Sequence, residues 1–131
     1  MKKKQRGFTM TEIVITMIMV AILAAVTVPI MTSTLENGKG MRAKSNLQLL
    51  TTIAHIYFNN TGDTVVRDFT DLGGMNGFYN INISDDNFSY SGTQQGSTYS
   101  FTATRISGSH IDETISADQD NQLSGTWPWI N

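Results

Sequence analysis

A stretch of 23 residues without a single charged side chain, residues 13–35, dominates the N-terminal third of this chain. Its apolar core, residues 13–31, is 19 residues long. A helix rises about 1.5 Å per residue, so this core would cover about 28 Å, close to the hydrocarbon thickness of a bilayer. Helices buried in soluble domains seldom run this long without a polar face. The stretch therefore predicts a membrane-spanning helix.

The charges outside this stretch predict its orientation. Residues 1–7 carry four positive charges and no negative one, from Lys2, Lys3, Lys4 and Arg6. Because basic flanks stay cytoplasmic, we expect the residues beyond about Met31 to lie outside the inner face of the membrane, in the periplasm or at the cell surface. From Phe8 onward five basic residues face eleven acidic ones. This acidic balance argues against a nucleic-acid partner, which needs a basic surface.

A secretory signal peptide is an alternative interpretation of the same segment. Such peptides also begin with a basic region and an apolar region, and they end at small residues such as Ala24 and Ala25. The apolar stretch is longer, however, than the usual apolar region of about 7–15 residues. The carboxylate of Glu12, at the very edge of the span, is a further argument against a simple signal peptide.

Glu12 has two physical interpretations. It could lie at headgroup depth and stabilise the helix N-terminus through the macrodipole. Alternatively, it pairs with a cation that becomes available when subunits pack. Cleavage between Gly7 and Phe8 would create an α-amino group four residues before Glu12. In a filament of staggered helices, the ammonium group of one subunit could pair with the carboxylate of another and fix the axial register.

The segment Lys4–Glu12, with the sequence KQRGFTMTE, is followed directly by the apolar span. It resembles the prepilin signature of type IV pilins and type II secretion pseudopilins. In that family a basic leader ends in Gly, a methylated Phe starts the mature chain, and Glu is its fifth residue. Gly7, Phe8 and Glu12 match these three positions. The absence of cysteine differs from many major pilins, whose C-terminal loop carries a disulfide.

The resemblance implies a processing and assembly pathway. A prepilin peptidase would cleave after Gly7 and methylate the new N-terminus at Phe8. The subunit would stay in the inner membrane as a single-pass protein, meet an inner-membrane assembly platform, and then join a filament with itself and related pilins. The filament would be a type IV pilus or a type II secretion pseudopilus.

We therefore expect three regions: a cleaved leader at residues 1–7, a hydrophobic transmembrane and assembly helix at 8–35, and an α+β head at 36–131. Pro29 lies late in the span. Inside a helix it removes one backbone hydrogen bond and clashes with the carbonyl group of Ala25. This predicts either a simple bend near the periplasmic surface or, by the family resemblance, a stretch that bends or melts during assembly.

In the head, the two glycines Gly38 and Gly40 predict a flexible or broken stretch, because each costs a helix about 1 kcal/mol. An amphipathic helix is expected over residues 41–60. Its apolar stripe comprises Ala43, Leu47, Leu50, Ile53, Ala54, Ile56, Tyr57 and Phe58, and its polar face carries Lys44, Gln48, Thr52, His55 and Asn59. A lone His there is a surface residue rather than a ligand or base. Residues 64–80 are expected to form an irregular loop.

After this loop the hydrophobic period changes to two. Apolar residues alternate with Ser, Thr and Asp around Phe88, Phe101 and Ile115, with turn signals at residues 91–96, 107–110 and 118–122. This pattern predicts three or four short antiparallel strands with one apolar face. Laid against the amphipathic helix, they would form a small α+β head. The pilin family has the same arrangement.

The remaining motifs have less specific interpretations. Asp112, Asp118 and Asp120 are candidate calcium ligands, although residues 118–121 also form a favourable hairpin turn, which we prefer. We therefore expect no cofactor. The segment Trp127–Ile130 closes the core or forms an adhesive patch, and we prefer the first.

No catalytic motif appears, so we predict a structural subunit rather than an enzyme. The alternative function is a secreted or singly membrane-anchored β-rich binding module.

Overall fold

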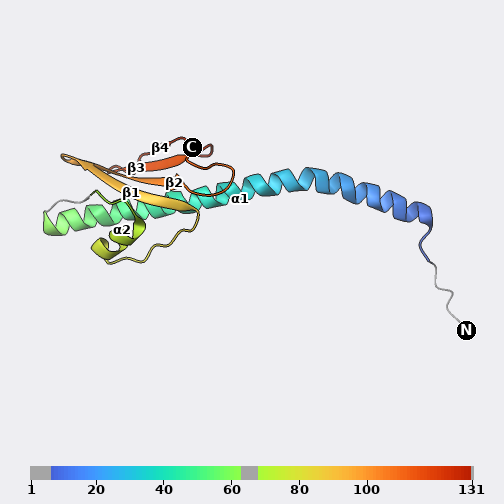
Figure 1. The fold of residues 1–131 in the computed structure, drawn as a ribbon, viewed down its shortest axis with the longest axis horizontal. Coiled ribbons are helices and arrows are strands. Elements are labelled where there is room, and N and C mark those ends of the chain that lie inside the picture. The colour runs from blue at the N-terminus through green and yellow to red at the C-terminus, as the bar shows by residue number, and fades with distance from the viewer. Residues whose placement is uncertain (1–6, 63–67, 131) are drawn as a thin grey trace, which may run out of the picture. The chain divides into compact units, whose positions relative to one another are not determined.

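The computed structural model describes residues 7–62 and 68–130, and it contains two helices and a four-stranded sheet in these ranges (Figure 1). The chain divides into two compact units, Met1–Glu36 and Asn37–Asn131. Helix α1, Met10–Thr61, supplies the helical residues of the first unit and the first helix of the second. It ends just before Gly62, where the sequence predicted the end of the helix.

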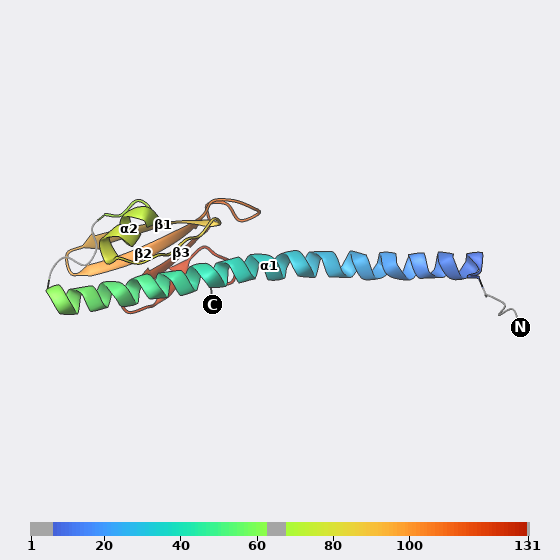
Figure 2. The same cartoon turned by 90° about the horizontal axis from the view of Figure 1, so that it is seen from below.

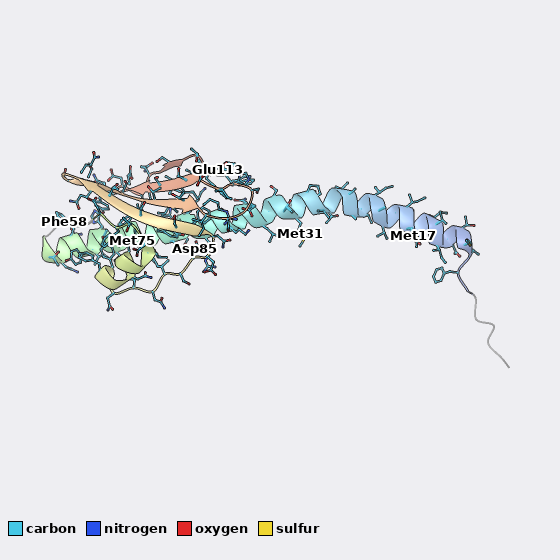
Figure 3. All side chains as sticks on the ribbon, viewed as in Figure 1. Met17, Met31, Phe58, Met75, Asp85 and Glu113 are labelled. Atoms are coloured by element: carbon cyan, nitrogen blue, oxygen red, sulfur yellow. The ribbon has the colours of Figure 1, made fainter. Side chains whose placement is uncertain are left out.

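In the first unit, every residue from Gly7 to Leu35 is exposed. The side chains of this part radiate outward from the helix, as Met17 and Met31 do in Figure 3. Two threonines near its middle bond to their own helix: Thr16 Oγ1 donates to the carbonyl of Ile13 at 2.9 Å, and Thr27 Oγ1 to that of Leu23 at 2.7 Å. These two hydroxyl groups therefore need no outside partner, which suits apolar surroundings.

The predicted break at the two glycines is wrong, because α1 continues through both. Gly40 is buried beneath the indole ring of Trp127. A Cβ atom added to Gly40 would lie 2.6 Å from Cε2 of that ring, whereas one added to Gly38 would meet nothing within 4 Å. The close approach of Trp127 explains a glycine at position 40, and packing of the surrounding residues outweighs its low helix propensity.

The predicted irregular loop over residues 64–80 also needs correction. Residues 63–67 lie outside the described part, but Leu72–Tyr79 form a second helix, α2. Asp71 is its N-cap, and Oδ1 of Asp71 accepts a hydrogen bond from the backbone N–H of Gly74 at 2.7 Å. Asn80 closes the helix in the left-handed conformation, with φ of 53°. These two caps stabilise a short helix that its three glycines disfavour.

Four antiparallel strands form one sheet in the order β1-β2-β3-β4: Phe88–Gln95, Thr98–Arg105, Thr114–Asp118 and Leu123–Gly125. The prediction of three to four strands is confirmed. The turn expected over residues 91–96 is much shorter, because β1 continues to Gln95, which pairs with Thr98. Only Gly96, at φ of 62°, and Ser97 form the turn. The turns expected over 107–110 and 118–122 are present.

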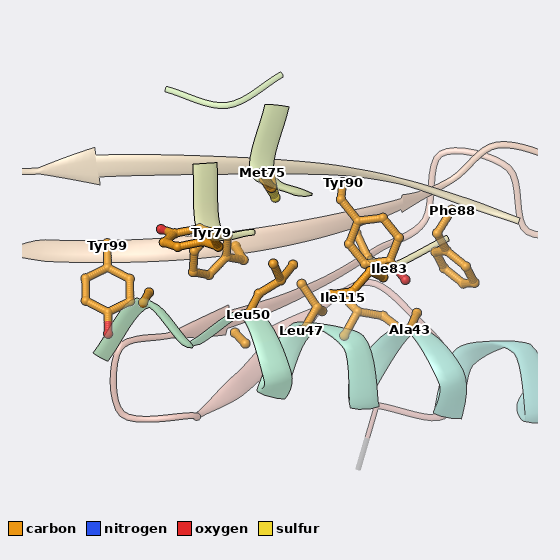
Figure 4. Close-up of a cluster of buried hydrophobic side chains, with 14 of the residues drawn as sticks. Ala43, Leu47, Leu50, Met75, Tyr79, Ile83, Phe88, Tyr90, Tyr99 and Ile115 are labelled. Carbon is orange, nitrogen blue, oxygen red and sulfur yellow. The ribbon is translucent and has the colours of Figure 1, made fainter. Parts of the chain in front are cut away.

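The core of the second unit lies between α1, α2 and the inner face of the sheet (Figures 2 and 4). Helix α1 contributes four fully buried apolar side chains, Ala43, Leu47, Leu50 and Ala54. The strands contribute Phe88, Tyr90, Tyr99, Phe101, Ala103, Ile115 and Ala117, and α2 adds Met75 and Tyr79. The predicted stripe is confirmed at these four α1 positions. Ile56 and Phe58, which we placed on the stripe, are instead about half exposed, at 55% and 49%.

The C-terminal segment closes this core, so the preferred interpretation of Trp127–Ile130 is confirmed for Trp127. That ring is buried and packs in edge contact against Phe88 and Trp129, with centroids 5.4 and 5.6 Å away. Lys44, which we placed on the polar face of the helix, donates from Nζ to the carbonyl groups of Trp129 and Ile130, both at 2.6 Å. This lysine fixes the end of the chain to α1.

A polar network fixes the segment between α2 and β1. Arg42 donates to the carbonyl of Ser84 at 3.0 Å. Tyr90 accepts a bond from Asn46 Nδ2 at 3.0 Å and donates its hydroxyl proton to Asp85 at 2.7 Å. Burial raises the pKa of Tyr90 above its ordinary value.

A long N-terminal helix, whose C-terminal part packs on a small antiparallel sheet, is the α+β pilin-like fold that the sequence predicted.

Candidate processing and assembly site

The predicted cleavage position lies outside regular structure. Residues 7–9 precede α1 and are not helical. Phe8 is 80% exposed, and a Cβ atom on Gly7 would meet nothing within 4 Å. The Gly7–Phe8 peptide bond is therefore sterically accessible. The basic residues that precede it lie outside the described part of the chain.

Glu12 is part of a capping box with Thr9 at the start of α1. The Thr9 backbone N–H donates to Oε2 of Glu12 at 2.9 Å, and the Thr9 hydroxyl donates to the same oxygen at 2.8 Å. In return, the Glu12 N–H donates to Thr9 Oγ1 at 3.3 Å. The carbonyl of Thr9 accepts the first helical bond, from Ile13 at 3.2 Å. These reciprocal bonds satisfy donors that a helix start otherwise leaves unpaired.

Thr9 is a residue that the sequence reasoning missed. The spacing Thr9-x-x-Glu12 directly before an apolar stretch is the sequence pattern of a capping box and could have identified it. Helix-terminus stabilisation was one of the two interpretations of Glu12. The capping box supports this interpretation in the single chain.

The apolar part of α1 has no covering within the described chain. The helix is long and apolar enough to cross a bilayer, by length and composition, and none of its most apolar 18-residue window is buried. A shallow apolar hollow on this part is lined by Thr16, Met17, Val20, Ala21 and Ala24. The small side chains of Ala21 and Ala24 in this hollow allow close approach of a second helix in a membrane.

Pro29, the other predicted assembly residue, lies within α1. The hydroxyl of Thr32 donates to its carbonyl at 3.0 Å, and that of Thr34 donates to the carbonyl of Ile30 at 2.9 Å. The helix therefore continues beyond the proline with side-chain bonds to its backbone. A role of Pro29 in assembly stays a prediction.

The structure does not gather the three calcium candidates into one group. Within residues 7–62 and 68–130, no three His, Asp or Glu side chains are grouped to hold a metal ion. Oδ1 of Asp118 accepts bonds from the backbone N–H groups of Asp120 and Gln122, at 3.0 and 2.8 Å, which stabilise the β3–β4 turn. Asp112 lies at φ of 66° in the loop before β3. His55 is exposed on α1, where we expected it.

Comparison with known proteins adds one finding. Residues 2–28 match the family model of the prokaryotic N-terminal methylation motif. The chain thus carries the signature of type IV pilin and pseudopilin precursors at the positions where Gly7, Phe8 and Glu12 indicated it. No curated protein and no solved structure matches the chain significantly. The matched motif ends before the head begins.

Proposed function

We propose that this chain is the precursor of a filament subunit, cleaved after Gly7 and N-methylated at Phe8 by a prepilin peptidase. The N-terminal methylation motif over residues 2–28 supports this processing. The accessible, non-helical peptide bond before α1 suits a protease, since proteolysis needs an extended substrate. The catalytic groups belong to the peptidase, and this chain serves as substrate and building block.

The observation that carries the proposal is the apolar part of α1, which is exposed around its whole circumference. In water such a surface requires a cover. The bilayer covers it in the single subunit, and helices of neighbouring subunits replace the lipid in the filament core. The hollow around Ala21 and Ala24 supports close packing of such helices.

Glu12 supplies the specific contact of the assembly. Its carboxylate pairs with the α-amino group of Phe8 on a neighbouring subunit. An unpaired carboxylate costs on the order of 2.5–3.5 kcal/mol at the bilayer centre, and less near its edge. Pairing removes this cost only in the correct axial register, so the pair selects one arrangement of subunits.

The positive charges before the apolar span determine how the proposed subunit is oriented in the membrane. The basic residues before Gly7 hold the N-terminus in the cytoplasm, and the head extends into the periplasm, where the inner-membrane platform adds the subunit to the filament. The proposal covers a type IV pilus and a type II secretion pseudopilus. Electron microscopy of cells with and without the protein separates them, because surface fibres that depend on the protein indicate a pilus.

Glu12→Gln is the test of the filament contact. Glutamine keeps the size of the side chain and can still form a capping box, but it removes the charge. We expect normal processing and membrane levels with filament yield reduced at least about tenfold, the effect of losing a charged partner. Asp86→Asn, an exposed position of the head, is the matched control and should assemble normally. Normal assembly of Glu12→Gln would remove the charge pair from the proposal.

A further inference from the structure

The loop between β2 and β3, residues 106–111, presents two large apolar side chains to solvent. Ile106 is 51% exposed and Ile111 is 55% exposed. Among the residues described after α1, no other aromatic or branched aliphatic side chain is as exposed. The backbone N–H of Asp112 donates to the carbonyl of Arg105 at 3.0 Å, so the two isoleucines are the first and last residues of a closed loop. The loop contains no Asp, Glu, Lys or Arg, and its surface is therefore apolar and nearly uncharged.

A partly exposed indole ring lies beside this loop. The ring of Trp129 packs in edge contact against His110 of the loop, with centroids 5.3 Å apart, and against Trp127 at 5.6 Å. Tryptophan is enriched where a membrane meets water, because its ring is apolar and its N–H group is polar. We define the end patch as Ile106, Ile111 and Trp129.

The end patch lies close to the point where the chain leaves the apolar span. The ring of His110 packs against Trp127 with centroids 5.4 Å apart, and Trp127 covers Gly40 of α1. Gly40 follows Leu35, the last residue of the charge-free stretch, by five residues of the same helix. At a rise of about 1.5 Å per residue, this step is about 8 Å long. The headgroup layer on each side of a bilayer is about 5–8 Å thick.

We propose that the end patch binds the lipid surface of the membrane in which the span is anchored, with its apolar side chains in the interfacial layer. This inference rests on the membrane anchoring of the proposed function, but it concerns the subunit before assembly. Lipid is the expected occupant because anchoring brings it to this end of every head without an encounter between two proteins. Basic and acidic side chains both occur here, Arg42 on α1 and Asp112 beside the loop. Apolar contact rather than lipid charge therefore determines binding.

Labelling at a single cysteine tests the inference, because the chain contains no other cysteine. Ser109→Cys places a nitrobenzoxadiazole label on the exposed loop and keeps both isoleucines. Ser97→Cys, in the β1–β2 turn at the other end of β2, is the matched control. Each full-length chain is reconstituted into phosphatidylcholine vesicles, and flotation with the vesicles measures anchoring. The label has a long fluorescence lifetime in lipid and a short one in water, so the two amplitudes give the ratio of lipid-contacting to water-exposed loops.

We expect the long lifetime to predominate for the label at position 109 and the short one at position 97. Exchanging Ile106 and Ile111 together for serine should lower the ratio at position 109 at least about tenfold, the effect of two half-exposed isoleucines that no longer enter lipid. Leu49→Ser, at a 46% exposed position of α1, should leave the ratio unchanged. Substitutions at such exposed positions leave the head folded, which tryptophan emission checks. Added phosphatidylglycerol should leave the ratio nearly unchanged.

Four results would overturn the inference. The first is a label at position 109 as exposed to water as the label at position 97, and the second is a ratio that the two serines do not lower. The third is lipid contact that requires phosphatidylglycerol, because charge would then bind the loop. The fourth is shielding that increases with the protein-to-lipid ratio, because a second copy would then cover the patch. These results leave the proposed function intact, whereas a chain that does not float with vesicles would contradict the membrane anchoring of that function.

Discussion

The two parts of helix α1 share one secondary structure and have opposite surroundings. Every side chain over residues 13–31 is exposed, and nearly all of them are apolar. Over residues 40–54, Ala43, Leu47, Leu50 and Ala54 are completely buried and the opposite face is polar. The second part is stabilised by its own head. The first part is apolar all round, and in the proposed function lipid and other subunits cover it.

Truncating a leucine in each of the two parts of α1 should give the largest difference in the free energy of unfolding of the head. Leu47→Ala removes a fully buried side chain and should lower the free energy of unfolding of the head by about 2–5 kcal/mol. Leu23→Ala, at a 66% exposed position in the span, should change it by less than about 0.5 kcal/mol. Both tryptophans, Trp127 and Trp129, lie in the head, so their fluorescence in micelles with added denaturant reports this unfolding. Equal changes in the free energy of unfolding for the two variants would contradict the division of α1 into a part packed in the head and a part exposed outside it.

The two glycines of α1 form a matched pair. Gly40→Ala would clash with the buried ring of Trp127 and should destabilise the head by about 1–3 kcal/mol. Gly38→Ala meets open space and should stabilise the helix by up to about 1 kcal/mol. The same fluorescence titration measures both changes. A stabilising Gly40→Ala would show that Trp127 does not need this close approach.

The cap of α2 should have a smaller effect. Asp71→Ala removes the acceptor for the Gly74 N–H and should cost about 1 kcal/mol of head stability. Asp71→Asn keeps a capping oxygen, so the stability of the head should stay within about a few tenths of a kcal/mol of the wild-type value. The difference in unfolding midpoint between these two variants measures the cap. If both variants unfold like the wild type, the cap does not hold α2.

Alkaline pH should lower the stability of the head and leave the exposed apolar part of α1, which carries no tyrosine, unaffected. Burial raises the pKa of both Tyr79 and Tyr90, so the folded head favours the neutral phenols. A tyrosine of the unfolded chain ionises near about pH 10, whereas these two ionise only at higher pH in the folded head. The stability that their neutral form gives the head is therefore fully present below about pH 10. It is lost as the pH rises from there towards the raised pKa values of the folded head. Tyrosinate absorbance and tryptophan fluorescence should therefore change together above about pH 10. Complete ionisation near pH 10 with fluorescence unchanged would contradict this.

The sequence predicted much of the molecule because several signals act locally. The apolar stretch, the alternation in the strands and the stripe through Leu47 are each visible within a few residues. The match over residues 2–28 supports the N-terminal motif in the same way. Gly7, Phe8 and Glu12 could be named as candidates because their order and spacing are themselves the signal.

Two features depended on partners far along the chain or on opposing local preferences. Gly40 was interpreted as a helix breaker because its contact, Trp127, is 87 positions away in sequence, and only packing shows why a glycine is required. Helix α2 was missed because its three glycines favoured an irregular loop, and the Asp71 cap that offsets them was not recognised. The cap at Thr9 was missed although its spacing to Glu12 is local, because the pattern Thr-x-x-Glu here overlaps the motif that carries the charge of Glu12.

Mass spectrometry of the mature chain isolated from membranes tests the central claim most directly. The account predicts an N-terminus at N-methylated Phe8, with the leader and its four positive charges removed and the apolar part of α1 retained. A start near Val26 would contradict it, because the span would then have been removed as a secretory signal peptide and could hold neither the membrane nor a filament core.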